Sequence, residues 1–227
     1  MLIRKDFKYE PKTVSDIIWG NAESRLRIED IVSGAESLPY CGKSAILLYG
    51  VFGTGKTTLA NLLPNAIEKG RAGQELGWEA DFIACQQGFN GPQVMVLIEK
   101  VLSKSSLNAS GLHYFIIDEV DNLTKLAQQS LKSALNTDRG IFILTTNNIS
   151  ELDKGLKDRC ILVEMNAAPV SDYLPLAKNL VSDMGVVMSD IDLLPTISAA
   201  NGSLRNLIHN VERLARRRTL PPPNVIY

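Results

Sequence analysis

The feature that most constrains this chain is a glycine-rich octapeptide between an apolar run and a helix-like segment. The run is Ala45–Tyr49, and the segment expected to be helical covers residues 57–63. The residues of the octapeptide are Gly50, Val51, Phe52, Gly53, Thr54, Gly55, Lys56 and Thr57. Glycines allow a tight turn in which successive backbone N–H groups point at an anion. A helix N-terminus adds partial positive charge there, so the octapeptide predicts a phosphate-binding P-loop for a nucleoside triphosphate.

Specific roles follow from the residue types in this loop. We expect Lys56 to bridge the terminal phosphates and to take part in catalysis, and the Thr57 hydroxyl to ligate Mg²⁺. Thr58 completes the set of nucleotide-contacting residues that we expect here. The cofactors predicted from the loop are therefore ATP and Mg²⁺.

Length and composition are those of an ordinary globular chain. Its 227 residues, 45% of them hydrophobic and 22% charged, suit one α/β core with a small appendage. No apolar stretch approaches the roughly 20 residues that span a bilayer, so we expect no membrane contact and a cytoplasmic location. The three cysteines are far apart and fit reduced thiols. The net charge of −1 means that any contact with DNA needs a local patch.

Four further apolar runs have the length and composition of buried strands: 80–85, 113–117, 141–145 and 161–165. Segments with helical spacing separate them, at about 92–103, 122–135 and 151–157. Strands that alternate with helices predict an α/β fold with a five-stranded parallel sheet flanked by helices on both faces. Ligands of such sheets bind at the carboxyl ends of the strands, where the P-loop also lies.

The pattern changes after residue 167 to helices alone. Apolar residues repeat at helical spacing over 173–184 and 204–215, with a shorter helix expected over 191–199. We therefore expect a nucleotide-binding α/β domain at 1–167, a small helical lid domain at 168–218 and an extended proline-rich tail at 219–227.

Two acids and an amide follow the third and fourth expected strands. Asp118 is expected beside the Mg²⁺, and Glu119 is expected to polarise the attacking water. Asn147 follows the fourth strand and is expected to orient that water against the γ-phosphate. Taken alone, each pattern also occurs in ordinary strand-end turns, and only their combination with the P-loop favours catalysis.

These motifs together resemble an AAA+ ATPase of the clamp-loader group, similar to replication factor C small subunits of the archaeal and phage type. The resemblance covers about residues 7–218. Its most specific part is Asp118-Glu119-Val120-Asp121 followed by the run 123–132. Residues 7–13 resemble the N-terminal box of the family, and Ile17 and Ile18 match the segment that cups adenine in relatives. The family carries a C-terminal collar domain after the lid, and we expect this chain to lack it.

The resemblance also assigns two arginines. Arg159, in Lys157-Asp158-Arg159-Cys160, resembles the arginine that reaches the γ-phosphate held by a neighbouring subunit, with Asp158 where serine is usual. Arg205, in Gly202-Ser203-Leu204-Arg205, resembles the lid arginine that contacts the nucleotide of its own subunit. A guanidinium is always charged and forks onto phosphate oxygens, so both roles are chemically apt.

The resemblance implies a homo- or hetero-oligomer of AAA+ subunits that couples ATP binding and hydrolysis to assembly on a sliding clamp and primer–template DNA. The alternatives are an AAA+ remodeller or regulator of a protein partner, and a nucleotide-binding module without turnover. No Lys or Arg occurs between Asp81 and Glu99, where the helix that tracks DNA in relatives is expected. The arginines at 213 and 216–218 form either a solvated helix end or a docking patch. The proline-rich tail is either a loose end or a peptide ligand for another protein.

Overall fold

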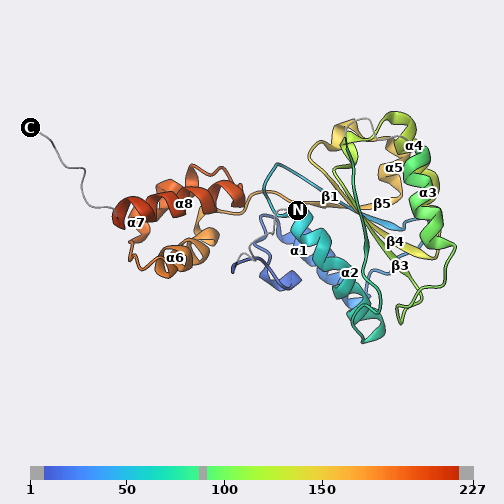
Figure 1. Ribbon diagram of the computed structural model, residues 1–227, viewed down its shortest axis with the longest axis horizontal. Coiled ribbons are helices and arrows are strands. Elements are labelled where there is room, and N and C mark those ends of the chain that lie inside the picture. The colour runs from blue at the N-terminus through green and yellow to red at the C-terminus, as the bar shows by residue number, and fades with distance from the viewer. Residues whose placement is uncertain (1–7, 87–90, 220–227) are drawn as a thin grey trace, which may run out of the picture.

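The computed structural model describes residues 8–86 and 91–219 (Figure 1). At its centre lies a sheet of five parallel strands. In spatial order the strands are β2 (Asp81–Ala84), β3 (His113–Asp118), β4 (Gly140–Thr146), β1 (Ala45–Tyr49) and β5 (Cys160–Glu164). The expected five-stranded parallel sheet is confirmed, and β1, which precedes the P-loop, lies between β4 and β5.

The central strands β1, β3 and β4 are buried almost throughout because both faces of the sheet are covered there, whereas the edge strand β2 has Phe82 and Ala84 exposed. In β1, Ala45 and Leu47 belong to the core on one face, while Ile46 and Leu48 belong to the core on the other. Side chains of a strand alternate between faces, so a strand buried on both sides reads as an unbroken apolar run.

Helices from separate parts of the chain cover each face. Helices α1 (Ala22–Ser33) and α2 (Lys56–Ala72) pack on one face. Helices α3 (Gly91–Leu102), α4 (Lys125–Ala134) and α5 (Lys154–Asp158) pack on the other (Figure 1). Short 3₁₀ helices at Val14–Asp16, Val120–Asn122, Ile149–Glu151 and Val170–Tyr173 complete the connections.

Two helices differ from the sequence expectation. Helix α2 runs to Ala72 rather than ending near residue 63, and it continues through Pro64. Helix α1 is not among the expected helices, because Ile28 and Ile31 are its only buried apolar residues and its apolar periodicity is weak. Its start is nevertheless well defined, since the Asn21 side chain caps the first turn.

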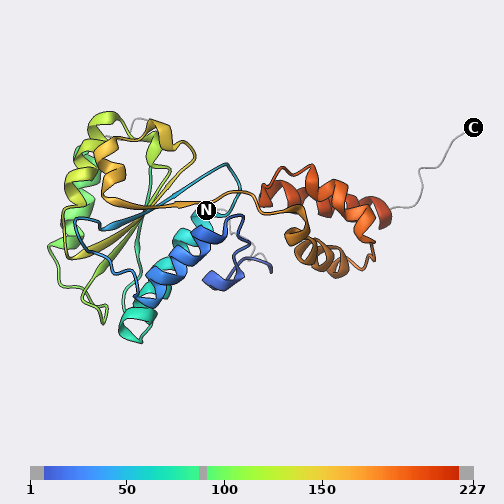
Figure 2. The same cartoon turned by 180° about the vertical axis from the view of Figure 1, so that it is seen from behind.

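The remaining helices form a separate lobe, here called the lid. They are α6 (Leu174–Asp183), α7 (Asp190–Ser198) and α8 (Leu204–Thr219). Their apolar faces enclose a small core of their own, and Figures 1 and 2 show this lobe joined to the sheet domain by the segment after β5. Tyr9 and Ile18 also pack against the lid core, so the N-terminal segment ties the two lobes together.

Some expectations fall on residues outside the described ranges. They concern Phe7 in the N-terminal box, the segment 87–90 before α3, and residues 220–227 of the proline-rich tail. Among the residues that the structure does describe, no helix is long and apolar enough to cross a membrane.

Candidate nucleotide-binding site

The P-loop joins the carboxyl end of β1 to the first residue of α2. Gly53 and Gly55 have φ values of +80° and +91°, which L-residues with a side chain rarely adopt. This backbone lets the loop curl back over the N-terminus of α2, whose unpaired N–H groups favour an anion. Thr54 is buried and donates to the Val51 carbonyl at 3.1 Å, which holds the loop closed, whereas Phe52 is largely exposed.

Lys56 points into the loop that precedes it. Its Nζ donates to the carbonyls of Gly50 at 2.9 Å and Val51 at 2.7 Å. Burial lowers the pKa of Lys56, and the nearby carboxylates of Asp121, Asp118 and Glu119 act against that shift. The ammonium is therefore held at the mouth of the P-loop, between its carbonyls and a group of acids.

The residues expected to hold Mg²⁺ lie together. The Thr57 hydroxyl donates to Asp118 Oδ1 at 2.9 Å, across the step from α2 to the end of β3. A hydroxyl and a carboxylate are the hard oxygen donors that Mg²⁺ takes, so this pair fits the ion. Thr57 and Asp118 would hold it, and the ion would supply positive charge for the phosphates. Thr58, the next residue of α2, is half-buried.

Glu119 begins a turn immediately after β3. Its backbone is left-handed, with φ 58° and ψ 52°, and its side chain is exposed. Asn122 Nδ2 donates to Glu119 Oε2 at 3.2 Å and to the Cys85 carbonyl at 3.1 Å. Asn122 therefore links the expected water-polarising acid to the end of β2, a contact that residue type and spacing did not indicate.

Asp121 is a second residue that the sequence analysis did not assign to the site. One carboxylate oxygen, Oδ1, is buried and has no hydrogen-bond partner among the described residues. Asp121 is also the first of the acids that raise the pKa of Lys56 against burial. The sequence could have pointed to Asp121 through its place in the Asp-Glu-Val-Asp motif. In the sequence analysis that motif served only to identify the resemblance to clamp loaders.

Asn147 follows β4 at the same edge of the sheet. Thr146 pairs with Tyr49 of β1, so Asn147 lies level with Gly50, the first residue of the P-loop. β4 lies between β1 and β3, which carry the P-loop and the acids. The half-buried Asn147 is therefore placed between the two motifs that it was expected to serve.

Ile17 and Ile18 lie at the junction of the two lobes. Ile17 is buried in the core between the sheet and α2, whereas Ile18 packs against the lid core. The pair expected to cup adenine thus contributes one side chain to each lobe.

The lid reaches the P-loop through the start of α8. The backbone N–H of Leu204 donates to the Gly53 carbonyl at 2.9 Å. A Cβ atom built on Gly53 would lie 2.3 Å from Ser203 Oγ, so only glycine permits this approach. Arg205 is the next residue after Leu204 and is exposed, which places it near the P-loop with its side chain accessible.

Arg159 is the one predicted site residue that lies away from this group. It precedes Cys160, which pairs with Ala45 at the first residue of β1, so Arg159 lies at the amino edge of the sheet. Its guanidinium donates to Asn136 Oδ1 at 2.9 Å and to the Gly155 carbonyl at 3.0 Å. Five residues of strand separate the two edges, which is roughly 16 Å, and Arg159 is not brought to the P-loop of its own chain.

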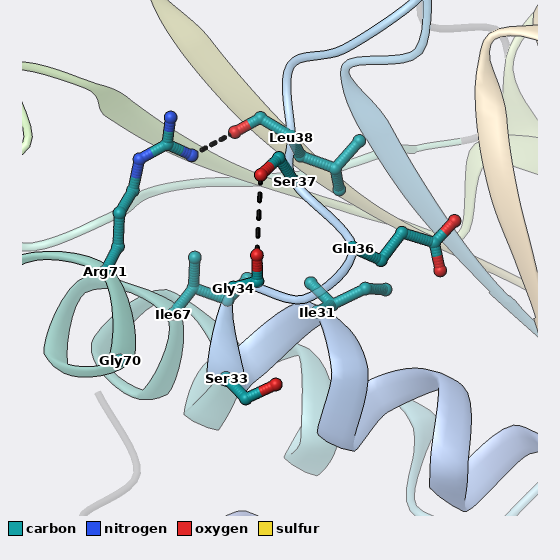
Figure 3. Close-up of a pocket in the computed structure, with 9 residues that line it drawn as sticks. All are labelled: Ile31, Ser33, Gly34, Glu36, Ser37, Leu38, Ile67, Gly70 and Arg71. Carbon is teal, nitrogen blue, oxygen red and sulfur yellow. Dashed lines mark hydrogen bonds between the residues drawn. The ribbon is translucent and has the colours of Figure 1, made fainter.

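A concavity of about 290 Å³ lies elsewhere, between the ends of α1 and α2 (Figure 3). Arg71 donates to the Leu38 carbonyl there, and the Glu36 side chain points away from Arg71. Two helix C-termini meet at this place, and their partial negative charge disfavours phosphate. Gly70 is about 21 Å along α2 from Lys56 at 1.5 Å per residue, so this concavity is distinct from the P-loop site.

A P-loop at the carboxyl end of a parallel sheet, two acids at the end of the next strand but one, and a helical lid whose last helix contacts the loop define a P-loop nucleotide-binding protein. Residues 46–165 match the family described as ATPase family associated with various cellular activities (AAA), which is more than half of the chain. The chain therefore belongs to the AAA family.

Curated relatives agree with the resemblance to clamp loaders. The chain is 27% identical to the replication factor C large subunit of Methanosarcina mazei, covering 92% of this chain and 33% of that protein. It is 27% identical to replication factor C small subunit 2 of Pyrobaculum islandicum, covering 90% and 61%. For replication factor C subunit 4 of Caenorhabditis elegans the identity is 28%, covering 92% and 61%. The expected resemblance to clamp-loader subunits is confirmed as a similarity to these proteins, and the chain spans less than two thirds of the length of each of them.

Solved structures support the same fold. The RuvB Holliday junction branch migration motor of Thermotoga maritima superposes with a TM-score of 0.61 at 19% identity, covering 92% of this chain and 64% of that one. A DNA polymerase III gamma subunit-related protein from the same organism gives 0.56 at 15% identity, covering 83% and 57%. This chain thus shares its fold with these two proteins.

Proposed function

We propose that this chain hydrolyses ATP as one subunit of a clamp-loader-like assembly that acts on a sliding clamp and primer–template DNA. The observation that carries the proposal is the convergence of Lys56, Thr57, Asp118 and Glu119 under a lid that touches the P-loop. Similarity to replication factor C subunits supports the clamp and the DNA as partners.

The chemistry of each site residue suits a specific role in binding or hydrolysing ATP. The P-loop N–H groups and Lys56 bind the phosphates, and Arg205 adds a cation from the lid. Thr57 and Asp118 would hold the Mg²⁺ ion. Glu119 accepts a hydrogen bond from the attacking water and acts as the general base that removes its proton. The side-chain amide of Asn147 orients the same water.

Arg159 suits action on a neighbouring subunit. The amino edge of the sheet cannot serve the P-loop at the carboxyl edge of the same chain, but it can meet the carboxyl edge of another copy. Such head-to-tail contacts are heterologous and build rings or open spirals. An arginine supplied by a neighbour stabilises the charge that develops during phosphoryl transfer.

Mixing two inactive variants tests this arrangement. Lys56→Ala removes ATP binding but keeps Arg159, and Arg159→Ala keeps ATP binding but supplies no arginine. We expect each variant alone to have little ATPase activity with primed DNA and clamp, and an equal mixture to recover part of it. The control is a mixture of Lys56→Ala with Glu119→Gln, in which no chain both binds and hydrolyses ATP.

Two results would contradict the proposal. If Arg159→Ala retains full activity at every protein concentration, Arg159 does not act between subunits. If the wild-type chain hydrolyses no ATP with or without DNA and clamp, the chain is a binding module rather than an ATPase.

A second candidate, a remodeller or regulator of a protein partner, is favoured by the surface of α3 and α4. Val96 and Leu97 of α3 and Leu126 of α4 are exposed to 62%, 44% and 67%. This apolar surface and the lack of Lys and Arg between Asp81 and Glu99 suit protein contact better than phosphate contact. Turnover stimulated by a protein other than a clamp, and unchanged by primed DNA, would favour this candidate.

A further inference from the structure

Thr145 is a buried threonine in contact with both acids of the site. It is the sixth residue of β4 and only 1% exposed. Its Oγ1 donates to Asp118 Oδ1 at 2.6 Å and accepts from the backbone N–H of Glu119 at 2.9 Å. One hydroxyl therefore holds the side chain of one acid and the main chain of the next.

The register of the sheet makes this contact possible. Ile117 of β3 pairs with Leu144 of β4, so Asp118 and Thr145 stand one step beyond the last pair. After Asp118 the chain leaves the strand, because Glu119 adopts the left-handed conformation. A residue with a side chain rarely adopts it without support from its surroundings. The Thr145 hydroxyl supplies that support by taking the Glu119 N–H.

Asp118 Oδ1 is consequently held from two directions. Thr57 Oγ1 donates to it at 2.9 Å from α2, and Thr145 Oγ1 donates to it at 2.6 Å from β4. Thr57 is itself an expected metal ligand, so its oxygen would also be needed to hold the ion. Thr145 has no such second task, and it remains the fixed partner of the Asp118 carboxylate.

We propose that Thr145 is the positioning residue of the acid pair: its hydroxyl orients the Asp118 carboxylate and supports the backbone turn that presents Glu119. This inference rests on the proposed ATPase function. Groups that hold a metal-binding carboxylate by a hydrogen bond typically change metal affinity or activity by about 10- to 100-fold when they are removed. Thr145 touches neither the phosphates nor the water, and it acts through Asp118 and Glu119.

Three substitutions distinguish a positioning role of the Thr145 hydroxyl from a role of the side chain in packing. Thr145→Val keeps the shape and removes the hydroxyl, Thr145→Ala removes it without risk of overpacking, and Thr145→Ser keeps it. The matched control is Ser44→Ala, which removes another buried hydroxyl, bonded to the Leu135 carbonyl at 2.6 Å at the opposite edge of the sheet. All four are compared with wild type by thermal unfolding.

Two measurements then decide the role. We expect Val and Ala to lower kcat with primed DNA and clamp by about 10- to 100-fold and Ser to restore most of it, while Ser44→Ala lowers only the melting temperature. In calorimetry without turnover, we expect Val and Ala to lose about tenfold in the gain of ATP affinity that Mg²⁺ provides, with affinity in EDTA unchanged.

Other outcomes overturn the inference. If Ser is as impaired as Val, or if Val and Ala match wild type in both measurements, the hydroxyl does not position the acids. If Val and Ala weaken binding equally with and without Mg²⁺, the effect is structural. A wild-type chain without turnover contradicts the proposed function instead, and the calorimetric comparison still decides the role of Thr145.

Discussion

The backbone N–H of Leu204 donates to the carbonyl of Gly53 at 2.9 Å, which connects the first residue of the last lid helix to the middle of the P-loop. Ser203 lies against Gly53 at the same place. The lid therefore contacts the part of the chain that surrounds the phosphates, and a change at this contact affects nucleotide binding.

Gly53→Ala is expected to weaken ATP binding. A side chain at φ +80° costs about 1–2 kcal/mol, and its Cβ would lie 2.3 Å from Ser203 Oγ. The matched control is Gly73→Ala at the end of α2, where φ is +70° and nothing lies within 4 Å. Calorimetry with ATP should show a loss for Gly53→Ala alone, while both variants lose stability in urea. Equal ATP affinity in the two variants would mean that the lid contact is unimportant.

Arg205→Ala is expected to weaken ATP affinity by about tenfold, the value of one charge-assisted hydrogen bond to phosphate. Arg205 is exposed beside the contact between Leu204 and Gly53. Arg213→Ala is the control, because Arg213 is exposed on the same helix about 12 Å farther along it. Titration of both variants with a labelled ATP analogue measures the difference. Equal weakening in the two would indicate a general charge effect rather than a contact.

Tyr114→Phe is expected to destabilise the fold by about 1–2 kcal/mol. Glu68 is fully buried, and its carboxylate accepts from Tyr114 Oη at 2.8 Å, Ser110 N at 2.8 Å and Ser110 Oγ at 2.6 Å. Burial, and then the hydrogen bond to Glu68, raise the pKa of Tyr114, so the phenol remains a donor at neutral pH. Urea unfolding measures the loss. Tyr40→Phe, at an exposed tyrosine, should change stability little, and an equal effect there would refute the argument.

Cys41 is expected to be the one cysteine that iodoacetamide modifies in the folded chain at pH 8. Burial raises the pKa of Cys85 and of Cys160 to about 12, so roughly one thiol in ten thousand is ionised at that pH. Cys41 is exposed. Mass spectrometry of the alkylated chain identifies the sites, and rapid modification of Cys85 without denaturant would contradict its burial.

The same pKa shifts predict the direction of alkaline unfolding. In the unfolded chain the two buried thiols ionise near 9, while in the folded chain they keep their protons to about 12. The folded state therefore binds more protons above pH 9, and stability falls as the pH rises through that range. Urea unfolding at pH 8 and pH 10 measures this fall, which a Cys85→Ala variant should reduce.

The fold was predictable because each strand and most helices are marked by the apolar pattern of their own residues. Ala45–Tyr49 is apolar at every position, and each of the other four strands is mainly apolar, with polar residues chiefly at its ends, so the number and parallel direction of the strands follow from composition and spacing. Helix α1 could not be found in this way. Its start depends on the Asn21 cap and its burial on two isoleucines, which a periodicity search overlooks.

The site residues, too, include some that the sequence predicts and some that only the structure reveals. Lys56 and Asp118 belong to motifs with fixed spacing, and the structure brings Lys56, Thr57 and Asp118 to one edge of the sheet. Thr145 has no motif of its own, because its contacts arise from the register between β3 and β4. Asp121 and Asn122 depend likewise on how the turn after Glu119 folds. The roles of Asn147, Arg159 and Arg205 stay predictions, and the experiments above test those of the two arginines.

Ile17 and Ile18 connect the N-terminal segment to both lobes. The peptide unit between them is planar, yet one side chain is anchored in the sheet domain and the other against the lid. A swing of the lid relative to the sheet domain would therefore have to turn the torsion angles on either side of this unit or pull one isoleucine out of its packing contacts.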